Sequence, residues 1–266
     1  MIAFVRELSP LVERCELSYI GRASIDAQRA RHQHQGYVAE LAARGCELRW
    51  LPPLPQHADG VFVEDTAVVL PELTVITRPG AVSRRAEVDS VAATLAPHTH
   101  LVHVRDPGTL EGGDVLCIGR RVYVGISGRT NAEGVAQLAA ALAPFDYAVH
   151  GVAMHGCLHL KSAVTFIPPD TLLVNAEWVD PALFGVQRIV HVAEPFGANT
   201  LTVGDVTLVS SDYPATQERL RQAGIATRAL EVSELHKAEA ALTCMSLIFE
   251  TLPGSAVLTR AQRAQE

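Results

Sequence analysis

One unit recurs along this chain: an apolar strand, a polar turn, an amphipathic helix and a second apolar strand. The clearest copy joins strands predicted at Thr66–Leu70 and Leu73–Thr77 to a helix at Arg84–Leu95 and a strand at Leu101–Val104. A second copy follows the same order, with a strand, a helix and a strand at 121–125, 131–142 and 147–152. Alternation of strands and helices over short connections predicts the α/β class.

The helices of these two copies share one apolar pattern, at positions i, i+3, i+4 and i+7. The residues with this spacing are Val88, Val91, Ala92 and Leu95 in the first helix, and Val135, Leu138, Ala139 and Leu142 in the second. The pattern predicts one apolar stripe on each helix, packed against a sheet. Ser83 and Asn131 are the expected N-caps, because their short polar side chains accept hydrogen bonds from free N–H groups.

Three further stretches fit the same unit more loosely. They are a helix at 24–44 before a strand at 46–51, strands at 171–175 and 188–192 around a short segment, and strands at 206–210 and 225–232 around a helix at 216–223. Copies spaced by about 30–50 residues favour a closed, propeller-like array. From the pattern alone, a doubly wound parallel sheet remains the alternative.

Composition narrows the functional classes. The net charge is −7 and no basic cluster is present, which argues against nucleic acid or an anionic membrane as a partner. No segment reaches the ~18 apolar residues of a membrane helix, and the first ten residues lack the apolar core of a signal peptide. The five cysteines are scattered without CxxC spacing, so we expect a reducing compartment, the cytoplasm.

Acidic residues cluster at two places. Asp59 and Asp65 flank an apolar segment that we expect to be a strand, and Glu64 stands beside Asp65. Adjacent carboxylates repel unless a cation compensates, so this is either a solvated strand end or a site for a metal or a guanidinium. Glu111 and Asp114 flank a pair of glycines, which indicates either a tight turn or a turn that directs Glu111 into a site.

Two arginines, Arg84 and Arg129, stand at matching helix starts, where a cation opposes the helix dipole. They are either incidental or together bind one carboxylate, which Arg contacts with two parallel hydrogen bonds. His155 and His159 would share a face at i, i+4 in a zinc-binding helix, although Gly156 disfavours a helix. Cys244 lies in an apolar run and is either a buried apolar residue or a nucleophile served by a distant His.

These segments, in this order, resemble one family, the dimethylarginine dimethylaminohydrolases. The resemblance covers residues 4–250 and is carried by FVED at 62–65, TRPGAVSRR at 77–85, TLEGGD at 109–114, SGRTN at 127–131, LHLKS at 158–162 and LTCMS at 242–246, with RHQHQ at 31–35. The family belongs to the guanidine-modifying enzymes, whose fold is a five-bladed α/β propeller, the pentein. The resemblance therefore implies one catalytic domain over residues 1–252, followed by a polar tail at 253–266.

The resemblance also implies the reaction. Cys244 would be the nucleophile, His159 the general acid/base, and Glu111 the carboxylate that orients His159. The substrate would be a cationic amino acid, an Nω-methylated arginine, converted to citrulline and an amine through a covalent thiouronium. This chemistry needs no metal and no organic cofactor.

The resemblance implies how the substrate is bound as well. The implied binding residues are Asp65 and Glu64 for the guanidinium, Arg84 and Arg129 for the α-carboxylate, and Asp59 with the main-chain carbonyl of Leu17 for the α-amino group. Two alternatives remain open. One is an arginine deiminase-type hydrolase, and the other is a non-catalytic protein on the same scaffold that binds zinc through His155, Cys157, His159 and Cys244. The sequence leaves the oligomeric state open, a homodimer included.

Overall fold

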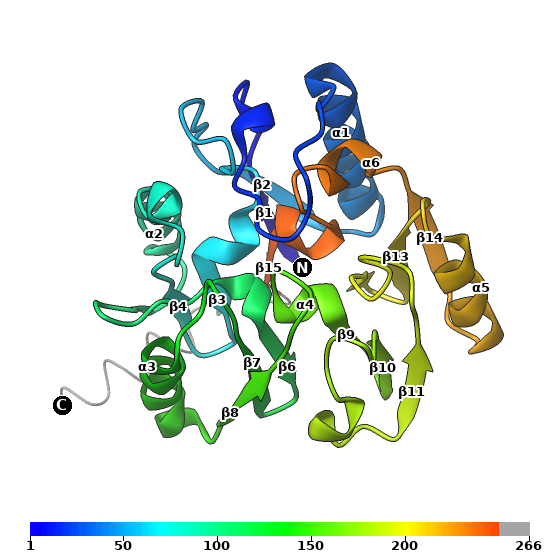
Figure 1. Cartoon of the computed structure of the whole chain (residues 1–266). Helices are drawn as coiled ribbons and strands as arrows, with labels where there is room; N and C mark the ends of the chain where they lie inside the picture. The colour runs from blue at the N-terminus through cyan, green and yellow to red at the C-terminus, as the bar shows by residue number, and fades with distance from the viewer. Residues whose placement is uncertain (250–266) are drawn as a thin grey trace.

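The computed structural model describes residues 1–249. Within this range the strands form five sheets of three, arranged around a common centre (Figure 1). The sheets, which we call blades 1 to 5, are β15(Leu247–Phe249)-β1(Ile2–Val5)-β2(Glu47–Trp50), β3(Ala67–Val69)-β4(Thr74–Ile76)-β5(Leu101–His103), β6(Val115–Ile118)-β7(Arg121–Ile126)-β8(Ala148–Ala153), β9(Val164–Ile167)-β10(Thr171–Val174)-β11(Arg188–His191) and β12(Leu201–Val203)-β13(Val206–Ser210)-β14(Thr227–Leu230). The expected five-bladed propeller is confirmed, and the doubly wound sheet is wrong.

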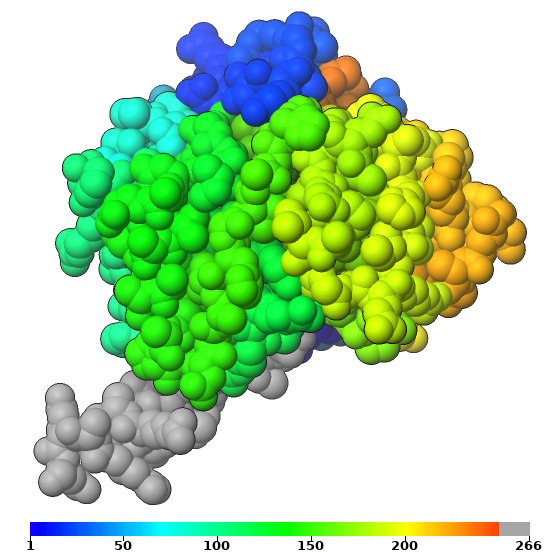
Figure 2. Space-filling view, turned by 60° about the horizontal axis from the view of Figure 1, so that its bottom comes forward, coloured from blue at the N-terminus to red at the C-terminus, as the bar shows by residue number. Residues whose placement is uncertain are grey.

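Every blade has the same pairing. Its first two strands run antiparallel and its middle and outer strands run parallel, as in β3, β4 and β5. A parallel pair requires a crossover, and this is why a helical segment separates the middle strand from the outer strand. The segments of successive blades follow one another around the surface (Figure 2).

Blade 1 closes the ring, because it combines the two ends of the described chain. β1 pairs antiparallel with β15, with Ile2 opposite Phe249, and parallel with β2. Phe4 packs its ring edge-on against Phe249 at 5.5 Å between centroids. The first and last strands therefore hold each other in place, and closure of the ring depends on both.

The crossover helices lie at the periphery (Figure 1). They are α1(Ala27–Ala43), α2(Glu87–Leu95), α3(Ala132–Leu142) and α5(Pro214–Gln222). Blade 4 has instead one short 3-10 helix, η6(Pro181–Phe184), which ends at Gly185 in the left-handed conformation. The predicted stripes are confirmed: Val91 and Leu95 of α2 are buried, as are Leu138 and Leu142 of α3.

The apolar core is divided among the blades rather than concentrated in one place. In blade 3, for example, Leu138 and Leu142 of α3 pack with Val122 and Val124 of β7. The same clusters also join neighbouring blades: Val91 of α2 packs with Ile76 of β4 in blade 2 and with Phe4 of β1 in blade 1. No helix within residues 1–249 is both long and apolar enough to cross a bilayer.

Two local expectations are wrong. Asn131 caps α3 as predicted, but Ser83 does not cap α2; it lies in the 3-10 helix η3(Val82–Arg84), and its hydroxyl donates to Glu16. The segment between Asp59 and Asp65 is a turn followed by the 3-10 helix η2(Val63–Thr66), not a strand. A buried arginine, Arg6, donates to the carbonyl of Gly60 in this turn. It thereby gives that buried carbonyl the hydrogen bond that a neighbouring strand would have given it in a sheet. The predicted tail at 253–266 lies outside the described residues.

The innermost strands, β3, β6, β9, β12 and β15, surround a central cavity of about 300 Å³. A short turn or helical segment precedes each of them at one end of this cavity. These segments are η2, η4(Gly112–Asp114), α4(Leu160–Ala163), the turn at 195–198, and η7(Leu242–Met245). Most of the residues singled out in the sequence lie on or beside them.

Candidate active site

Four of these segments bring together the residues expected to do chemistry. Asp65 lies in η2, Glu111 directly before η4, His159 directly before α4, and Cys244 in η7. Asp65, His159 and Cys244 line one small cavity; the others that line it are Glu16, Asp59, Phe62, Arg84, Arg129, Leu158, Ala238, Glu239 and Ala240. The segments are far apart in sequence, and the ring of blades makes them neighbours.

His159 lies between carboxylates. Its Nε2 is 2.7 Å from Glu111 Oε2, and its Nδ1 is 3.8 Å from Asp65 Oδ1. Burial alone would lower the pKa of His159, but Asp65, Asp114 and Glu111 outweigh it and raise this pKa to about 9. At neutral pH the imidazole is therefore protonated and able to act as an acid.

Glu111 is the partner that keeps this proton on the ring. Burial by itself would raise the pKa of Glu111, but the hydrogen bond to His159 and the nearby guanidinium groups of Arg84 and Arg129 lower it to about 2. Glu111 stays ionised, and it also accepts a hydrogen bond from the backbone N–H of Gly80. Its orientation is thus fixed from two sides.

Asp114 fixes the position of the histidine segment. Its carboxylate accepts from the backbone N–H of Leu160 at 3.0 Å and from the hydroxyl of Ser127 at 2.7 Å. Since Leu160 is the first residue of α4 and follows His159, this contact holds the backbone from which the imidazole projects. Burial raises the pKa of Asp114 to about 6.

The paired glycines let the segments approach one another closely. A Cβ on Gly112 would lie 2.0 Å from the carbonyl oxygen of Glu64, and one on Gly113 would lie 2.6 Å from Nδ1 of His159. Neither glycine has a positive φ, so close approach rather than left-handed backbone requires them here. Any side chain at Gly113 would displace the imidazole.

Cys244 is buried on η7, and its thiol is the fourth member of the group. Burial raises the pKa of this thiol well above its ordinary value, and the nearby carboxylates of Glu64 and Asp65 add to the effect. These surroundings therefore favour Cys244 as a thiol. A cation placed beside Asp65 would reverse part of this effect and favour the thiolate.

Arg84 and Arg129 differ in how fully they are engaged. Arg84 is buried and donates to Asp65 at 2.5 Å, to Glu87 at 2.9 Å and to the carbonyl of Phe62. Arg129 lies 3.5 Å from Glu111 and donates to the hydroxyl of Ser18. Both line the cavity, but Arg129 has more donor capacity free for a ligand.

The N-terminal loop covers the cavity. The carboxylate of Glu239 accepts the backbone N–H groups of Ser18 at 2.6 Å and Tyr19 at 2.9 Å, and that of Asp59 accepts the N–H of Glu16 at 3.2 Å. Burial raises the pKa of Asp59 to about 6. The enclosed volume is about 20 Å³, room for about one water molecule. A cavity of this size has to widen before it can hold an amino acid.

Glu239 was not singled out in the sequence. It lies between two alanines, and no motif around it marks a functional residue. Its left-handed backbone, with φ of +57°, and its hydrogen bond to Ser18, 221 residues away, become visible only in the structure. Leu17 does not line the cavity; its side chain is half-buried and packs against the apolar cluster of blade 1.

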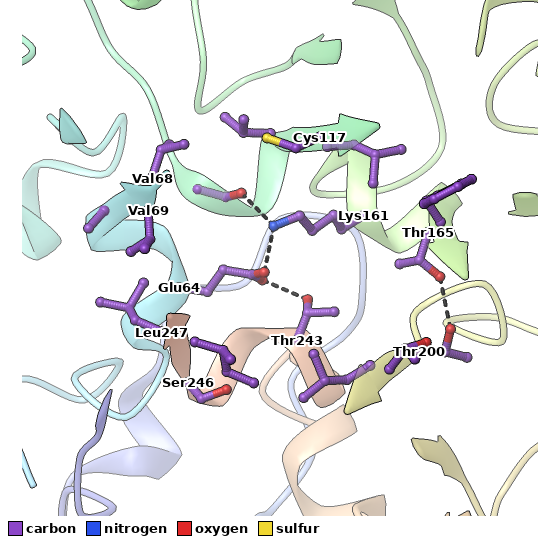
Figure 3. Close-up of a pocket in the computed structure, with 18 of the residues that line it drawn as sticks. Glu64, Val68, Val69, Cys117, Lys161, Thr165, Thr200, Thr243, Ser246 and Leu247 are labelled. Carbon is purple, nitrogen blue, oxygen red and sulfur yellow. Dashed lines mark hydrogen bonds and ion pairs between the residues drawn. The ribbon is translucent and has the colours of Figure 1, made fainter. Parts of the chain in front are cut away.

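Glu64 faces the opposite side of its backbone, into the central cavity (Figure 3). Its Oε1 accepts from Lys161 Nζ at 2.7 Å, and its Oε2 accepts from the hydroxyl of Thr243 at 2.6 Å. The same alternation holds at η7, where Thr243 faces the central cavity and Cys244 faces the site. Two cavities thus lie back to back across these segments.

The zinc set proposed as an alternative is not brought together. His155 lies exposed in a loop, and the thiol of Cys157 contacts the carbonyl of His159. Within residues 1–249, the acid and histidine side chains close enough to share a metal are those of Asp65, Glu111 and His159. Neither cysteine belongs to this group.

Comparisons with known proteins agree with this arrangement. Residues 50–195 match the family model of arginine deiminase. The chain is 40% identical over 248 residues to an N(G),N(G)-dimethylarginine dimethylaminohydrolase from Streptomyces coelicolor, covering 92% of this chain and 95% of the relative. It is 32% identical over 243 residues to a protein of the same name from Pseudomonas aeruginosa, covering 90% and 95%.

A solved structure gives the same result. The dimethylarginine dimethylaminohydrolase of Pseudomonas aeruginosa, as a mutant complexed with citrulline, matches with a TM-score of 0.88 at 29% identity, over 93% of this chain and 98% of that one. An adduct of dimethylarginine dimethylaminohydrolase with S-methyl-L-thiocitrulline matches at 0.87 and 30% identity, over 93% and 98%.

Proposed function

The chain belongs to the family of the dimethylarginine dimethylaminohydrolases, and from that premise we propose that it hydrolyses Nω-methylated arginines to citrulline and an amine. The observation that carries this proposal is the convergence of the Cys244 thiol and the His159–Glu111 pair on one cavity beside Asp65. This gives a nucleophile, a proton donor and an anion for the guanidinium in one place.

In the first half-reaction the cationic guanidinium lies against Asp65 and favours ionisation of Cys244, whose proton is released to water. The sulfur attacks the guanidinium carbon and forms a C–S bond. Protonated His159 gives its proton to the methylated nitrogen as the C–N bond breaks, and methylamine or dimethylamine leaves. The pKa of about 9 for His159 supports this acid role at neutral pH.

In the second half-reaction the neutral His159 takes a proton from water. The oxygen attacks the carbon bound to sulfur and the C–S bond breaks. The remaining proton of that oxygen goes to the leaving sulfur, which restores the Cys244 thiol, and citrulline leaves. Glu111 keeps the imidazole oriented in both steps, because its carboxylate holds Nε2. These two half-reactions require no metal and no organic cofactor.

Substrate binding follows from the lining of the cavity. Arg84 and Arg129 bind the α-carboxylate, and Asp59 binds the α-amino group in place of the N–H of Glu16. The main-chain carbonyl of Leu17 joins Asp59 when the loop rearranges around the substrate. Glu64 would have to leave Lys161 and Thr243 to reach a guanidinium, so we assign that contact to Asp65.

We place this single-domain enzyme, residues 1–252, in the cytoplasm. Its five cysteines are all free, which supports a reducing compartment.

A second activity is favoured by one observation, the match of residues 50–195 to the arginine deiminase family model. One assay separates the two. Purified chain is given asymmetric dimethylarginine, arginine or agmatine, and citrulline and amine release are measured. We expect citrulline and dimethylamine from the methylated substrate. Preferential turnover of arginine to citrulline and ammonia would keep the thiol mechanism and reject the proposed substrate.

A further inference from the structure

One of the five segments that precede the innermost strands has no assigned part. Four of them carry or adjoin Asp65, Glu111, His159 and Cys244. The fifth is the turn at 195–198, which leads through Asn199 into β12. Asn199 is only 4% exposed, and it does not line the cavity that Cys244 and His159 share. A buried amide at this position needs hydrogen-bond partners, and its partners show what it does.

The side chain of Asn199 joins the segment of His159 to that of Cys244. Its Nδ2 donates to the main-chain carbonyl of Lys161 at 3.1 Å and to the hydroxyl of Thr243 at 3.0 Å. Its Oδ1 accepts from the backbone N–H of Thr243 at 3.1 Å. Lys161 lies two residues after His159, and Thr243 directly precedes Cys244, so one amide spans both.

The hydroxyl of Thr243 and the ammonium of Lys161 extend this contact to two more blades. The hydroxyl accepts from Asn199 and donates to Glu64 Oε2 at 2.6 Å, while Lys161 Nζ donates to Glu64 Oε1 at 2.7 Å and to the carbonyl of Gly112 at 3.2 Å (Figure 3). The donor and acceptor roles of Thr243 are thus both used. The network connects η2, η4, α4 and η7 from the side of the central cavity.

We infer that Asn199 is a positioning residue that holds η7 against α4 and so fixes the separation of the Cys244 thiol from the His159 imidazole. It touches neither the site cavity nor the reacting atoms, and acts through Thr243 and the backbone of Lys161. Misplacement of reacting groups by about 1 Å costs about 100-fold in rate. The inference rests on the proposed function for its kinetic consequence, but the geometry can also be tested without turnover.

The kinetic experiment uses two variants and one control. Asn199→Ala removes all three hydrogen bonds, and Asn199→Asp keeps the shape while removing both N–H donors. Asn175→Ala is the matched control, because Asn175 is 2% exposed and its side chain, among residues 1–249, accepts only from the N–H of Glu177 in its own loop. We expect kcat to fall about 100-fold in both Asn199 variants with KM within about threefold, which is the pattern of lost alignment. The control should keep kcat within about twofold at a similar loss in melting temperature.

A second readout does not depend on turnover. Iodoacetamide labelling of Cys244, followed by peptide mass spectrometry across a pH series, reports the exposure and ionisation of the thiol. Release of η7 should speed labelling about tenfold in both variants, and in Asn199→Ala it should move the midpoint to lower pH, because burial is the largest cause that raises the pKa of Cys244. If Asn199→Ala does not fold, the rate of labelling in Asn199→Asp serves this test, since the added carboxylate acts on the midpoint in the opposite direction.

The outcomes separate the two claims. Labelling of Cys244 that is unchanged in both Asn199 variants would overturn the positioning role, whatever the kinetics. A native chain that releases no citrulline, with labelling still altered by Asn199→Asp, would reject the proposed function and keep the positioning role. A fall in kcat equal to that of Asn175→Ala, in an active enzyme, would reduce Asn199 to a general contribution to folding.

Discussion

The protonation states of Cys244 and His159 have one cause in common, the carboxylate of Asp65. Burial raises the pKa of the Cys244 thiol and Asp65 adds to the effect, while Asp65, Asp114 and Glu111 raise the pKa of His159, so a thiol and an imidazolium stand side by side. A cationic substrate beside Asp65 lowers the pKa of the thiol and so favours the thiolate that attacks. The site therefore ionises its nucleophile when the substrate arrives and keeps its acid charged beforehand.

The upper limit of activity in pH should follow His159. Its pKa is about 9, so kcat/KM is expected to fall as pH rises through about 9 and the proton donor is lost. Glu111→Gln removes an anion that favours the charged ring, so the descending limb should move to lower pH, and kcat should fall about 10²–10⁴-fold. A pH–rate profile of both proteins checks this. An unmoved limb in the variant would assign it to another group.

Both arginines should contribute to substrate binding, and Arg84 should in addition support the fold. Arg129→Ala is expected to raise KM for a methylated arginine about tenfold or more with a small loss of stability. Arg84→Ala removes the guanidinium that pairs with the buried carboxylates of Asp65 and Glu87, so it should also lower the free energy of unfolding by about 3–5 kcal/mol. Steady-state kinetics with urea denaturation measures both effects. Equal stability of the two variants would contradict the assignment.

At the scale of elements, each blade supplies one short segment, and the ring makes the five segments adjacent. The strands and the amphipathic helices could be predicted because their signals are local periodicities, as for Leu138 and Leu142. The crossover of blade 4 could not, since Pro181 and Gly185 limit it to one 3-10 turn. The turn that follows Asp59 could not be predicted either, because its Gly60 carbonyl is bound by Arg6, which is 54 residues away in the sequence.

The same limit applied to the site. Cys244, His159, Glu111, Asp65, Asp59, Arg84 and Arg129 were singled out in sequence by motif, and the structure brings them to one place. Glu239 and Asn199 carry no motif, and their contacts depend on segments 221 and 44 residues away. The direction of Glu64 likewise depends on Lys161 across 97 residues. Side-chain direction in a short 3-10 segment has no periodic signal from which to predict it.

The loop over the site should be released by Glu239→Ala. Without that carboxylate the amides of Ser18 and Tyr19 lose their acceptors, and we expect their hydrogen exchange to become about tenfold faster. Glu234→Ala is the matched control, because Glu234 accepts from the N–H of Asp26 further along the same region. It should speed exchange at Asp26 and leave Ser18 and Tyr19 unchanged. Mass spectrometry after exchange measures both variants. Exchange at Ser18 and Tyr19 that is the same in Glu239→Ala and in the native chain would exclude Glu239 as the residue that holds the loop.

At the scale of the whole molecule, blade 1 makes the propeller a closed ring, so we expect it to unfold in one cooperative transition. Phe4→Ala removes a ring that packs on Phe249 in the closing blade and should destabilise the whole chain by about 3–5 kcal/mol. Trp50 in blade 1 and Trp178 in blade 4 allow a test by fluorescence of the Trp50→Phe and Trp178→Phe variants. Both reporters should shift together. If Phe4→Ala left the unfolding midpoint reported by Trp178 in blade 4 unchanged, the prediction that the closed ring unfolds as one unit would be contradicted.

The central claim is that Cys244 attacks the guanidinium carbon of a methylated arginine and carries a covalent intermediate. The most direct measurement is mass spectrometry of peptides from enzyme mixed with asymmetric dimethylarginine and quenched in acid within the first turnover. We predict a mass increase on the peptide of Cys244 equal to the substrate less dimethylamine, absent from the other cysteine peptides and from Cys244→Ser. Citrulline formation by the native chain without any adduct on Cys244, or undiminished turnover by Cys244→Ser, would contradict the account.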